Sequence, residues 1–390
     1  MRKKSVRDLP WTDRRALIRV DFNVPLRGGE VADDSRLRAA LPTIRFLRER
    51  AGPLTLLSHL GRPKGKPDAA LSLRPIAVVL GRLLESEVQF IPHVAGPEAE
   101  AAVRAAKPGQ VTLLENTRFD PGETRNDPAL ASQFARLGDV FVNDAFGSAH
   151  RAHASTVGVA GLLPAVAGLL LEREIRFLSL ALEAPEHPYI AILGGAKVSD
   201  KIGVIRRLMT VVDRFLMGGG MANTFLAAQG LDLKESLVEA SSIETASELL
   251  KVGRERFVLP IDVIAAESLE AGSRTQAVPV DRIPSGWRAV DIGPKTRLAF
   301  RDAVQGAKLI VWNGPVGVFE IPAFSEGTRD VALAVADSQA TTIVGGGDSA
   351  AAVNNLGIAD RFSHVSTGGG ASLEFLEGRD LPGIAVLEDA

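Results

Sequence analysis

The chain has 390 residues, of which 46% are hydrophobic and 24% are charged. This length predicts more than one domain, and the composition is that of a globular protein, which excludes a disordered chain or a coiled coil. Since 45 basic residues nearly balance 47 acidic ones, the net charge of −2 provides no bulk attraction to nucleic acid or to an anionic membrane. There is no cysteine, so disulfides, thiolate metal ligands and a cysteine nucleophile are excluded.

The first residues are basic, but Asp13, Arg14 and Arg15 stand where a signal peptide would have its apolar stretch. We therefore expect a cytoplasmic protein. The longest uncharged stretch, residues 154–171, contains three glycines and Pro164, which argues against a membrane span.

Short apolar runs recur along the chain, each followed by a polar or glycine cluster and then by a helix-like segment. This order predicts an α/β fold with two mainly parallel sheets flanked by helices. In the first half we expect strands at 17–20, 54–57, 88–91, 111–114 and 140–142. In the second half we expect strands at 189–193, 215–217, 309–312, 341–344 and 362–365.

Between these two sets of strands, leucine and isoleucine repeat over residues 171–182 with the spacing of one helical face, and Pro185 follows. We expect this helix to connect two domains of similar size. The first domain would take residues 1–168, the connector 169–185 and the second domain 186–371.

Four glycine clusters each follow an expected strand of the second half: 194–195, 218–220, 345–347 and 368–370. Parallel strands end at one edge of their sheet, so the four clusters would line one crevice where backbone amides can approach a phosphate. A tight turn or close packing is the better explanation for any single cluster, but four together favour a phosphate site. The P-loop and protein-kinase patterns are both absent, which leaves other kinase families open.

Charged residues follow these glycines. Lys197 and Lys201 are four residues apart, which would place them on one face of an expected helix where both could bind one anion; a solvated lysine face is the plainer alternative. Asp348 could bind a Mg²⁺ that bridges nucleotide phosphates, or begin a helix as its N-cap, or both. Glu320 could accept hydrogen bonds from a ribose, although alone it is weak evidence.

Basic side chains gather at expected strand ends and loops of the first half: Arg36, His59, Arg62, Arg118 and Arg151. The planar arginine group binds phosphate oxygens in pairs, and although a surface ion pair is the commoner role of one arginine, the shared position favours an anion site. Asp21 and Asn23 could hold a substrate hydroxyl or orient an arginine. His150 and His153 lack a third ligand, so we expect hydrogen bonding rather than metal binding.

Nine longer blocks occur in the order of a known family along essentially the whole chain. They are 19–25, 58–63, 114–119, 143–153, 193–201, 218–225, 312–320, 345–349 and 366–371. The blocks resemble those of phosphoglycerate kinases. The resemblance implies reversible phosphoryl transfer between 1,3-bisphosphoglycerate and MgADP, giving 3-phosphoglycerate and MgATP, in glycolysis and gluconeogenesis. It also implies two Rossmann-like domains that close about a hinge, residues 372–390 returning to the first domain, a monomer, and no nucleic-acid or membrane partner.

The resemblance also implies the site residues. Substrate would bind to Asp21, Phe22, Asn23, Arg36, His59, Leu60, Gly61, Arg62, Arg118 and Arg151. The nucleotide would bind to Gly195, Ala196, Lys201, Gly220, Asn313, Glu320, Gly346, Gly347, Asp348 and Ser349, and Asp348 would also bind Mg²⁺. The attacking carboxylate is already ionised at neutral pH and needs no general base. The groups expected to stabilise the moving phosphoryl group are Arg36, Lys197, Gly368, Gly369 and Gly370.

The chain departs from the family at Ala289, where glycine is common, so we expect an added methyl group to narrow the adenine pocket. Two other classes of protein are alternatives. A two-lobed anion-binding protein without catalysis would carry an export signal and would need no second, glycine-lined site. A nucleotide-dependent dehydrogenase would show G-x-G-x-x-G after its first strand, and this chain does not.

Overall fold

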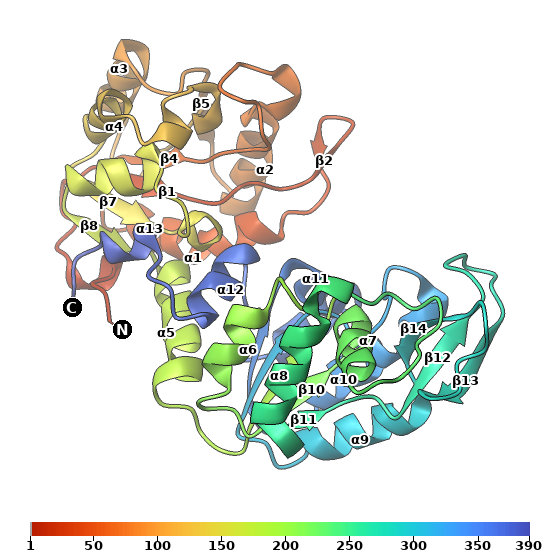
Figure 1. Cartoon of the computed structure of the whole chain (residues 1–390). Helices are drawn as coiled ribbons and strands as arrows, with labels where there is room; N and C mark the ends of the chain where they lie inside the picture. Colours follow the sequence, from red (N-terminus) through yellow and green to blue (C-terminus); the bar gives the residue numbers. More distant parts are fainter. Residues whose placement is uncertain (1) are drawn as a thin grey trace. The chain divides into compact units, whose positions relative to one another are not determined.

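Figure 1 shows the computed structural model of the chain, which describes residues 2–390. Two compact units are present: one takes the residues up to Arg176 together with Asp380–Ala390, and the other takes Phe177–Arg379. Each unit contains its own six-stranded parallel sheet. The expected fold class, α/β with two parallel sheets flanked by helices, is therefore confirmed.

The sheet of the first unit has the strand order β5-β6-β4-β1-β7-β8. Its strands are β1 (Ala16–Arg19), β4 (Leu54–Leu57), β5 (Val88–Ile91), β6 (Val111–Leu114), β7 (Val140–Asn143) and β8 (Ala165–Ala167). The five strands expected in this half are confirmed. The sixth, β8, was not expected, because its Ala-Val-Ala sequence has little β-branched character and lies in a glycine- and alanine-rich run.

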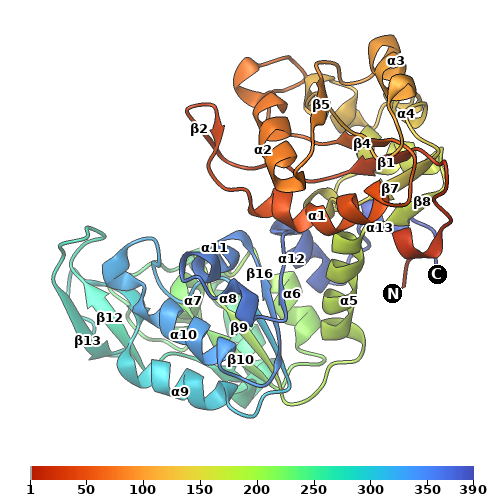
Figure 2. The same cartoon turned by 180° about the vertical axis from the view of Figure 1, so that it is seen from behind.

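Helices cover both faces of this sheet (Figures 1 and 2). The apolar sides of α1 (Ser35–Arg48) and α2 (Arg74–Leu84) share one core with the sheet. The chain then reverses direction across the sheet, and right-handed crossovers place α3 (Pro97–Ala105) and α4 (Pro128–Ala135) on the opposite face. A short hairpin of β2 (Leu26–Arg27) and β3 (Glu30–Val31) precedes α1.

The sheet of the second unit has the order β11-β10-β9-β15-β16-β17. Its strands are β9 (Tyr189–Leu193), β10 (Arg214–Met217), β11 (Phe257–Val258), β15 (Leu309–Asn313), β16 (Thr341–Gly345) and β17 (His364–Val365). The expected strand at 362–365 is shorter in the structure, because Phe362 still ends a 3-10 turn over Ala359–Arg361. The strand order reverses between β9 and β15, and ligands of open parallel sheets bind at such a point.

Helices α6 (Ile202–Leu208), α7 (Gly219–Ala228) and α8 (Ile243–Gly253) lie on one face of this sheet. Helices α9 (Pro294–Val304), α10 (Glu326–Ala336) and α11 (Gly347–Asn355) lie on the other face. A separate antiparallel sheet of β12 (Asp262–Ala266), β13 (Thr275–Pro279) and β14 (Arg288–Ile292) was not expected from the sequence.

The connector helix, α5 (Leu169–Glu183), begins where the sequence indicates and ends just before Pro185. The contact-defined units meet within this helix, between Arg176 and Phe177. The second unit continues to Arg379 rather than stopping at 371, because α12 (Gly370–Leu376) packs on α6. The packing is close enough that a Cβ at Gly203 would lie 2.8 Å from Glu377 Cδ.

The last residues of the chain complete the first unit, and both termini lie there (Figures 1 and 2). Helix α13 (Pro382–Ala385) accepts a 2.8 Å hydrogen bond at Gly383 O from Asn143 Nδ2. Closer to the end of the chain, Glu388 O accepts a hydrogen bond from Lys4 N at 2.9 Å. Over residues 2–390, we find no helix with the length and apolar character needed to cross a membrane.

Candidate active site

In the first unit, the loops after β1 and β4 hold one polar cluster. Arg36, at the start of α1, forms an ion pair with Asp21, and its Nη1 lies 2.9 Å from Asp21 Oδ2. Asn23 Oδ1 accepts a hydrogen bond from Gly61 N at 2.9 Å, so the two loops are joined directly. The structure therefore brings together residues that the sequence places far apart.

A cationic cavity of about 550 Å³ adjoins this cluster. It is lined by Arg62, Lys64, Gly65, Arg118, Asp120, Pro121, Thr124, Arg125 and Arg151. Arg118, in the 3-10 turn η3 (Thr117–Phe119), donates from Nη1 to Gly61 O at 2.7 Å, which ties the cavity to the loop after β4. Burial and the neighbouring Arg151 and Arg19 lower the pKa of Arg118 to about 10, so it is still a cation at neutral pH. Such a cavity favours an anionic ligand.

The two apolar residues of the expected substrate set have buried side chains. Phe22 and Leu60 are buried in the core of the first unit. Their backbone amides donate to Ser58 Oγ at 2.9 Å and to Asn116 Oδ1 at 3.1 Å. These two residues therefore hold the shape of the loops, and their side chains are not available to a ligand.

His59 lies beneath the surface of the first unit, with only 5% of it exposed. Its Nδ1 is 3.1 Å from Nη2 of Arg19, a buried cation at the end of β1. Burial and the charges of Arg19 and Arg118 hold the pKa of His59 well below its usual value, so the ring is neutral at pH 7. No role was expected for Arg19, although a charged residue at the end of an apolar strand is a signal for one.

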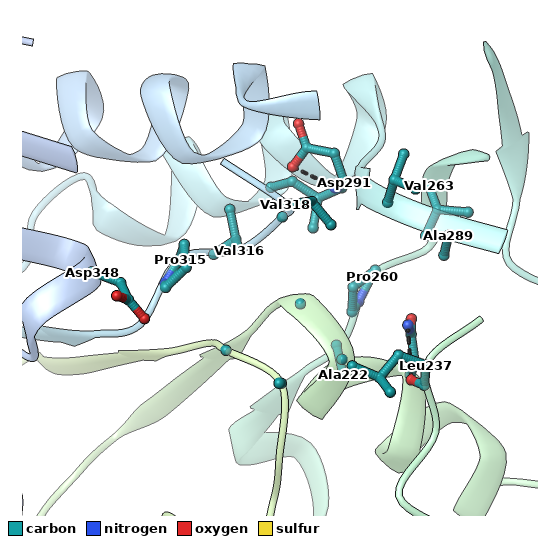
Figure 3. Close-up of a pocket in the computed structure, with 18 of the residues that line it drawn as sticks. Ala222, Leu237, Pro260, Val263, Ala289, Asp291, Pro315, Val316, Val318 and Asp348 are labelled. Atoms are coloured by element: carbon teal, nitrogen blue, oxygen red, sulfur yellow. Dashed lines mark hydrogen bonds between the residues drawn. The ribbon is translucent and has the colours of Figure 1, made fainter. Parts of the chain in front are cut away.

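The second unit contains a cavity of about 260 Å³ (Figure 3). Five residues of the expected nucleotide set line it: Gly195, Ala196, Gly220, Glu320 and Asp348. Figure 3 shows Asp348 at one end and Val263 and Ala289 at the other. Ala289 lines this cavity, as expected from the sequence. The rest of its apolar wall was not expected and is formed by Leu237, Pro260, Val263, Val316 and Val318. The cavity is thus polar at one end and apolar at the other.

Close packing explains the first two glycine clusters. A Cβ at Gly194 would lie 2.0 Å from Pro315 O, and one at Gly218 would lie 2.4 Å from Val316 Cβ. The amides of Gly194 and Gly195 donate to Asn313 O at 3.0 Å and to Pro315 O at 2.9 Å. These amides are therefore occupied by protein groups and are not open to a phosphate.

The third cluster is different. Gly346 has φ +86° and is the N-cap of α11, so the alternative of Asp348 as N-cap is wrong; Asp348 lies exposed in the first turn. Within residues 2–390, the amides of Gly347, Asp348 and Ser349 make no protein hydrogen bond. Asn313 is 2% exposed, and its Nδ2 also has no protein partner. Open amides at a helix N-terminus beside an unpaired amide group suit a phosphate.

The fourth cluster lies beside the third but does not line the cavity of Figure 3. Gly369 has φ +49° and precedes α12, and Ser372 Oγ donates to Gly369 O at 2.7 Å. A Cβ at Gly345 would lie 3.3 Å from Ser372 Oγ, so the third cluster packs against the first turn of α12 (Gly370–Leu376).

The two lysines do not share a helical face, so that expectation is wrong. Helix α6 begins only at Ile202, because Gly195 with φ +102° starts a bend and the amide of Lys201 closes a turn on Val198 O at 2.9 Å. Lys197 is exposed, whereas Lys201 is buried and donates from Nζ to Gly194 O and to Asn313 O. Burial lowers the pKa of Lys201 to about 8.

No group of three or more His, Asp or Glu side chains able to hold a metal ion occurs in the part of the chain that the structure describes. Asp348 alone lies at the polar end of the second cavity. One carboxylate fits Mg²⁺, since this ion commonly takes one or two carboxylates and completes its shell with phosphate oxygens and water.

Two parallel-sheet units, one with a cationic cavity and one with a glycine-lined cavity, define an enzyme of phosphoryl transfer. A family model described as phosphoglycerate kinase matches residues 6–379. The curated phosphoglycerate kinases of Chloroflexus aurantiacus and Roseiflexus castenholzii are 56% and 55% identical to this chain, and the alignments cover 100% of both proteins. The chain therefore belongs to the phosphoglycerate kinase family.

Solved structures agree with this assignment. Phosphoglycerate kinase from Coxiella burnetii superposes with a TM-score of 0.89 at 43% identity, and the match covers 98% of each chain. The enzyme from Pyrococcus horikoshii has a TM-score of 0.88 at 32% identity, again over 98% of each chain. The protein is thus a kinase of glycolysis with a carboxyl group as acceptor, and the non-catalytic and dehydrogenase alternatives are wrong.

Proposed function

We propose that the first unit binds 3-phosphoglycerate or 1,3-bisphosphoglycerate and that the second unit binds MgATP or MgADP. The observation that carries this proposal is that each unit has its own anion site. The cavity of Arg62, Arg118 and Arg151 suits a phosphorylated acid, because several cations converge on it. The open amides of α11 suit nucleotide phosphates, and the apolar end of the other cavity suits a base.

The proposed substrate contacts come from the polar cluster and the adjoining cationic cavity of the first unit. Asp21 and Asn23 hold the loops and accept substrate hydroxyls, and Gly61 offers its backbone. Phosphate and carboxylate oxygens bind to His59, Arg62, Arg118 and Arg151. Arg36 reaches the acyl group from α1, where Asp21 holds its guanidinium at 2.9 Å.

The nucleotide contacts lie around the polar end of the second cavity. The phosphates bind near Gly346, Gly347 and Ser349, with Asn313 Nδ2 as a further donor. Glu320 accepts from the ribose, and Gly195, Ala196 and Gly220 border the nucleotide. Lys201 supplies a buried cation beside them. Asp348 holds Mg²⁺, which neutralises phosphate charge when bound.

In the direction of 1,3-bisphosphoglycerate formation, a carboxylate oxygen of 3-phosphoglycerate attacks the γ-phosphorus, and the bond from phosphorus to the ADP oxygen breaks. The carboxylate is already ionised, so no side chain needs to remove a proton. The residues position the groups and stabilise charge, with Arg36, Lys197 and the amides of Gly368, Gly369 and Gly370 around the moving group.

We also propose that the enzyme is a cytoplasmic monomer whose two units close about residues 165–185 when both ligands are bound. Closure would bring together two sites on separate units and exclude water during transfer. Small-angle X-ray scattering would show a smaller radius of gyration with both ligands than with either alone; an unchanged radius would contradict closure.

A coupled assay tests the proposed function. Purified protein, MgATP and 3-phosphoglycerate are mixed with a dehydrogenase that consumes the acyl phosphate and oxidises NADH. We expect oxidation only when all three components are present. Arg36→Ala should lower kcat far more than it weakens MgADP binding, whereas Arg38→Ala, an exposed residue of the same helix, should change neither. Weakened MgADP binding with unchanged kcat would contradict the role of Arg36.

A further inference from the structure

A buried cation lies beneath the substrate residues of the first unit. Arg19 is the last residue of β1 and is 1% exposed. Its Nε donates to Ser155 Oγ at 2.8 Å, and its Nη1 donates to Val20 O. Its Nη2 faces His59 Nδ1 at 3.1 Å. A charge in this position is costly, so the contacts of Arg19 call for an explanation beyond packing.

The chemistry of guanidinium fixes the direction of the contact with His59. Every polar hydrogen-bonding group of arginine is a donor, and none is an acceptor. His59 Nδ1 must therefore accept, which is possible only when this nitrogen carries no proton. Because the ring is neutral, its single proton lies on Nε2. Within residues 2–390, no protein group is hydrogen-bonded to His59 Nε2, so that donor is open to a ligand.

Glu123 supplies the negative charge that balances Arg19, and it determines which groups of the network donate hydrogen bonds and which accept them. It is fully buried in η4 (Glu123–Arg125) and accepts from Ser155 Oγ at 2.6 Å and from Ser155 N at 3.0 Å. Burial alone would raise its pKa, but the neighbouring His153, whose Nδ1 lies 3.6 Å from Glu123 Oε1, the charge of Arg19 and the hydrogen bond from Ser155 lower it to about 2. Since Ser155 gives its hydroxyl proton to Glu123, its oxygen accepts from Arg19.

We propose that Arg19 is a positioning residue that holds His59 in the tautomer with its proton on Nε2, so that an anionic substrate meets an N–H donor. The other tautomer would present a lone pair to the anion and repel it. The inference rests on the proposed function, in which His59 binds an oxygen of 3-phosphoglycerate. Arg19 acts through His59 and does not itself touch the substrate.

The tautomer can be measured without any substrate. Long-range ¹H–¹⁵N NMR distinguishes protonated from unprotonated ring nitrogens, and the chain has only 6 histidines, so His59→Gln identifies the signals of His59. We expect the wild-type protein to show one tautomer, protonated at Nε2, throughout pH 6 to 8. We expect Arg19→Met, which has no hydrogen-bond donor, to show both tautomers. A proton on Nδ1 in the wild-type protein, or an unchanged spectrum in Arg19→Met, would overturn the proposal.

A double-mutant cycle measures the consequence for the substrate. Arg19→Met should raise KM for 3-phosphoglycerate about tenfold with little change in kcat, the size of effect expected when a buried hydrogen-bonding group loses its partner. The amide of Gln always has N–H donors, so in a His59→Gln background the Arg19 substitution should change KM less than twofold. Equal effects in both backgrounds would show that Arg19 does not act through His59.

Control variants distinguish an effect on the His59 tautomer from a loss of folding and from a general loss of positive charge. Arg19→Met leaves Glu123 without the nearby charge of Arg19, so Arg19→Met/Glu123→Gln, which removes both charges, should fold and still show mixed tautomers. Arg15→Gln removes a partly exposed cation near the start of the same strand and should leave KM unchanged. If 3-phosphoglycerate leaves the His59 signals unmoved, the proposed substrate site fails while the tautomer assignment stands.

Discussion

Lys201 is a buried lysine, and burial disfavours its charged ammonium form. Its Nζ is held by the carbonyl oxygens of Gly194 and Asn313, and burial lowers its pKa to about 8. The ammonium form is therefore present at pH 7 but is lost as pH rises through 8. A nearby phosphate would favour the ammonium form and recover part of this cost.

This charge predicts a pH dependence of nucleotide binding. ADP affinity should fall as pH rises from 7 to 9, by up to about tenfold, because most of the binding cation is then deprotonated. Isothermal titration calorimetry at pH 7, 8 and 9 measures the change. Lys201→Gln should bind weakly at every pH and show a flatter profile, whereas the exposed Lys251→Gln should behave as the wild type. A profile of Lys201→Gln as steep as that of the wild type would contradict the assignment.

Alanine substitutions at two glycines of the second unit are expected to have different effects, one on stability and the other on ADP binding. Gly194→Ala would place a methyl group 2.0 Å from Pro315 O and 2.8 Å from Gly314 O. Because these are backbone atoms, which cannot turn away as a flexible side chain could, we expect a loss of about 3 kcal/mol or more in unfolding free energy. At Gly347 no atom lies within 4 Å of the added methyl group, so Gly347→Ala should keep its stability within about 0.5 kcal/mol. Instead it should weaken ADP binding.

Thermal unfolding and calorimetry with ADP test this contrast between Gly194 and Gly347. Equal stability losses in the two variants would show that the space beside Gly347 is not open. An unchanged ADP affinity in Gly347→Ala would show that the phosphates bind elsewhere.

At the level of elements, one buried carboxylate anchors the start of the connector helix. Asp144, in the loop after β7, accepts from Leu170 N at 3.0 Å and Leu171 N at 3.3 Å. Leu169 N donates to Thr43 Oγ1 at 2.9 Å, so α5 is also held by α1. These bonds satisfy amides that a helix N-terminus leaves unpaired. The first half of α5 is thereby fixed within the first unit.

The anchor predicts a pH-dependent contribution to stability. Burial raises the pKa of Asp144 from 3.8 to about 6, so between these pH values the native state holds a proton that the unfolded state has lost. The contribution of this group to stability therefore falls as pH rises through that range, by up to about 3 kcal/mol. Asp144→Asn keeps an acceptor oxygen without the charge and should gain stability relative to wild type between pH 4 and 7.

Urea unfolding at pH 4.5, 5.5 and 7 measures this difference. Asp127→Asn is a matched control, because Asp127 caps α4 from a partly exposed position and accepts from Ala129 N and Leu130 N. Parallel stability profiles for wild type and Asp144→Asn would contradict the prediction.

The predictability of the elements depended on what surrounds them. Central strands such as β1 and β9 are buried along their whole length. Their sequences are apolar runs that a pattern can detect, interrupted in β1 only by its last residue, Arg19. Strand β13 is exposed at four of its five positions and has no such pattern, so the antiparallel sheet went unnoticed. Residues 197–201 have helical spacing, but the bend at Gly195 and the buried Val198 place them in a turn.

For the whole molecule, the location of polar residues was predictable and their partners were not. Strand ends and sequence blocks indicated Asp21, Arg118 and Asp348, because parallel strands end at one edge. The contact of Arg118 with Gly61, and that of Arg19 with His59, join segments far apart in the chain and have no local signal. The apolar wall around Leu237 and Val263 was missed for the same reason.

The end of the chain completes the unit in which the chain began, and this connects the last residues to the substrate site. Gly383 N donates to Ala149 O at 2.8 Å, close in sequence to Arg151, and Gly383 O accepts from Asn143 Nδ2 at 2.8 Å. Leu381, Ile384 and Leu387 are buried. Removing this segment should therefore disturb the loop that carries Arg151 without touching the second unit.

We expect deletion of Asp380–Ala390 to weaken 3-phosphoglycerate binding at least tenfold and to leave ADP binding within about twofold, because only the first unit loses buried contacts. Calorimetry with each ligand on the same preparation measures both affinities. Deletion of Asp389 and Ala390 alone is the control: it removes the ion pair between Lys3 and the exposed Asp389, a kind of pair that contributes about 1 kcal/mol or less. Equal loss of both ligands would show that the last residues support the whole molecule, and unchanged binding of both would show that the Arg151 loop holds its conformation without them.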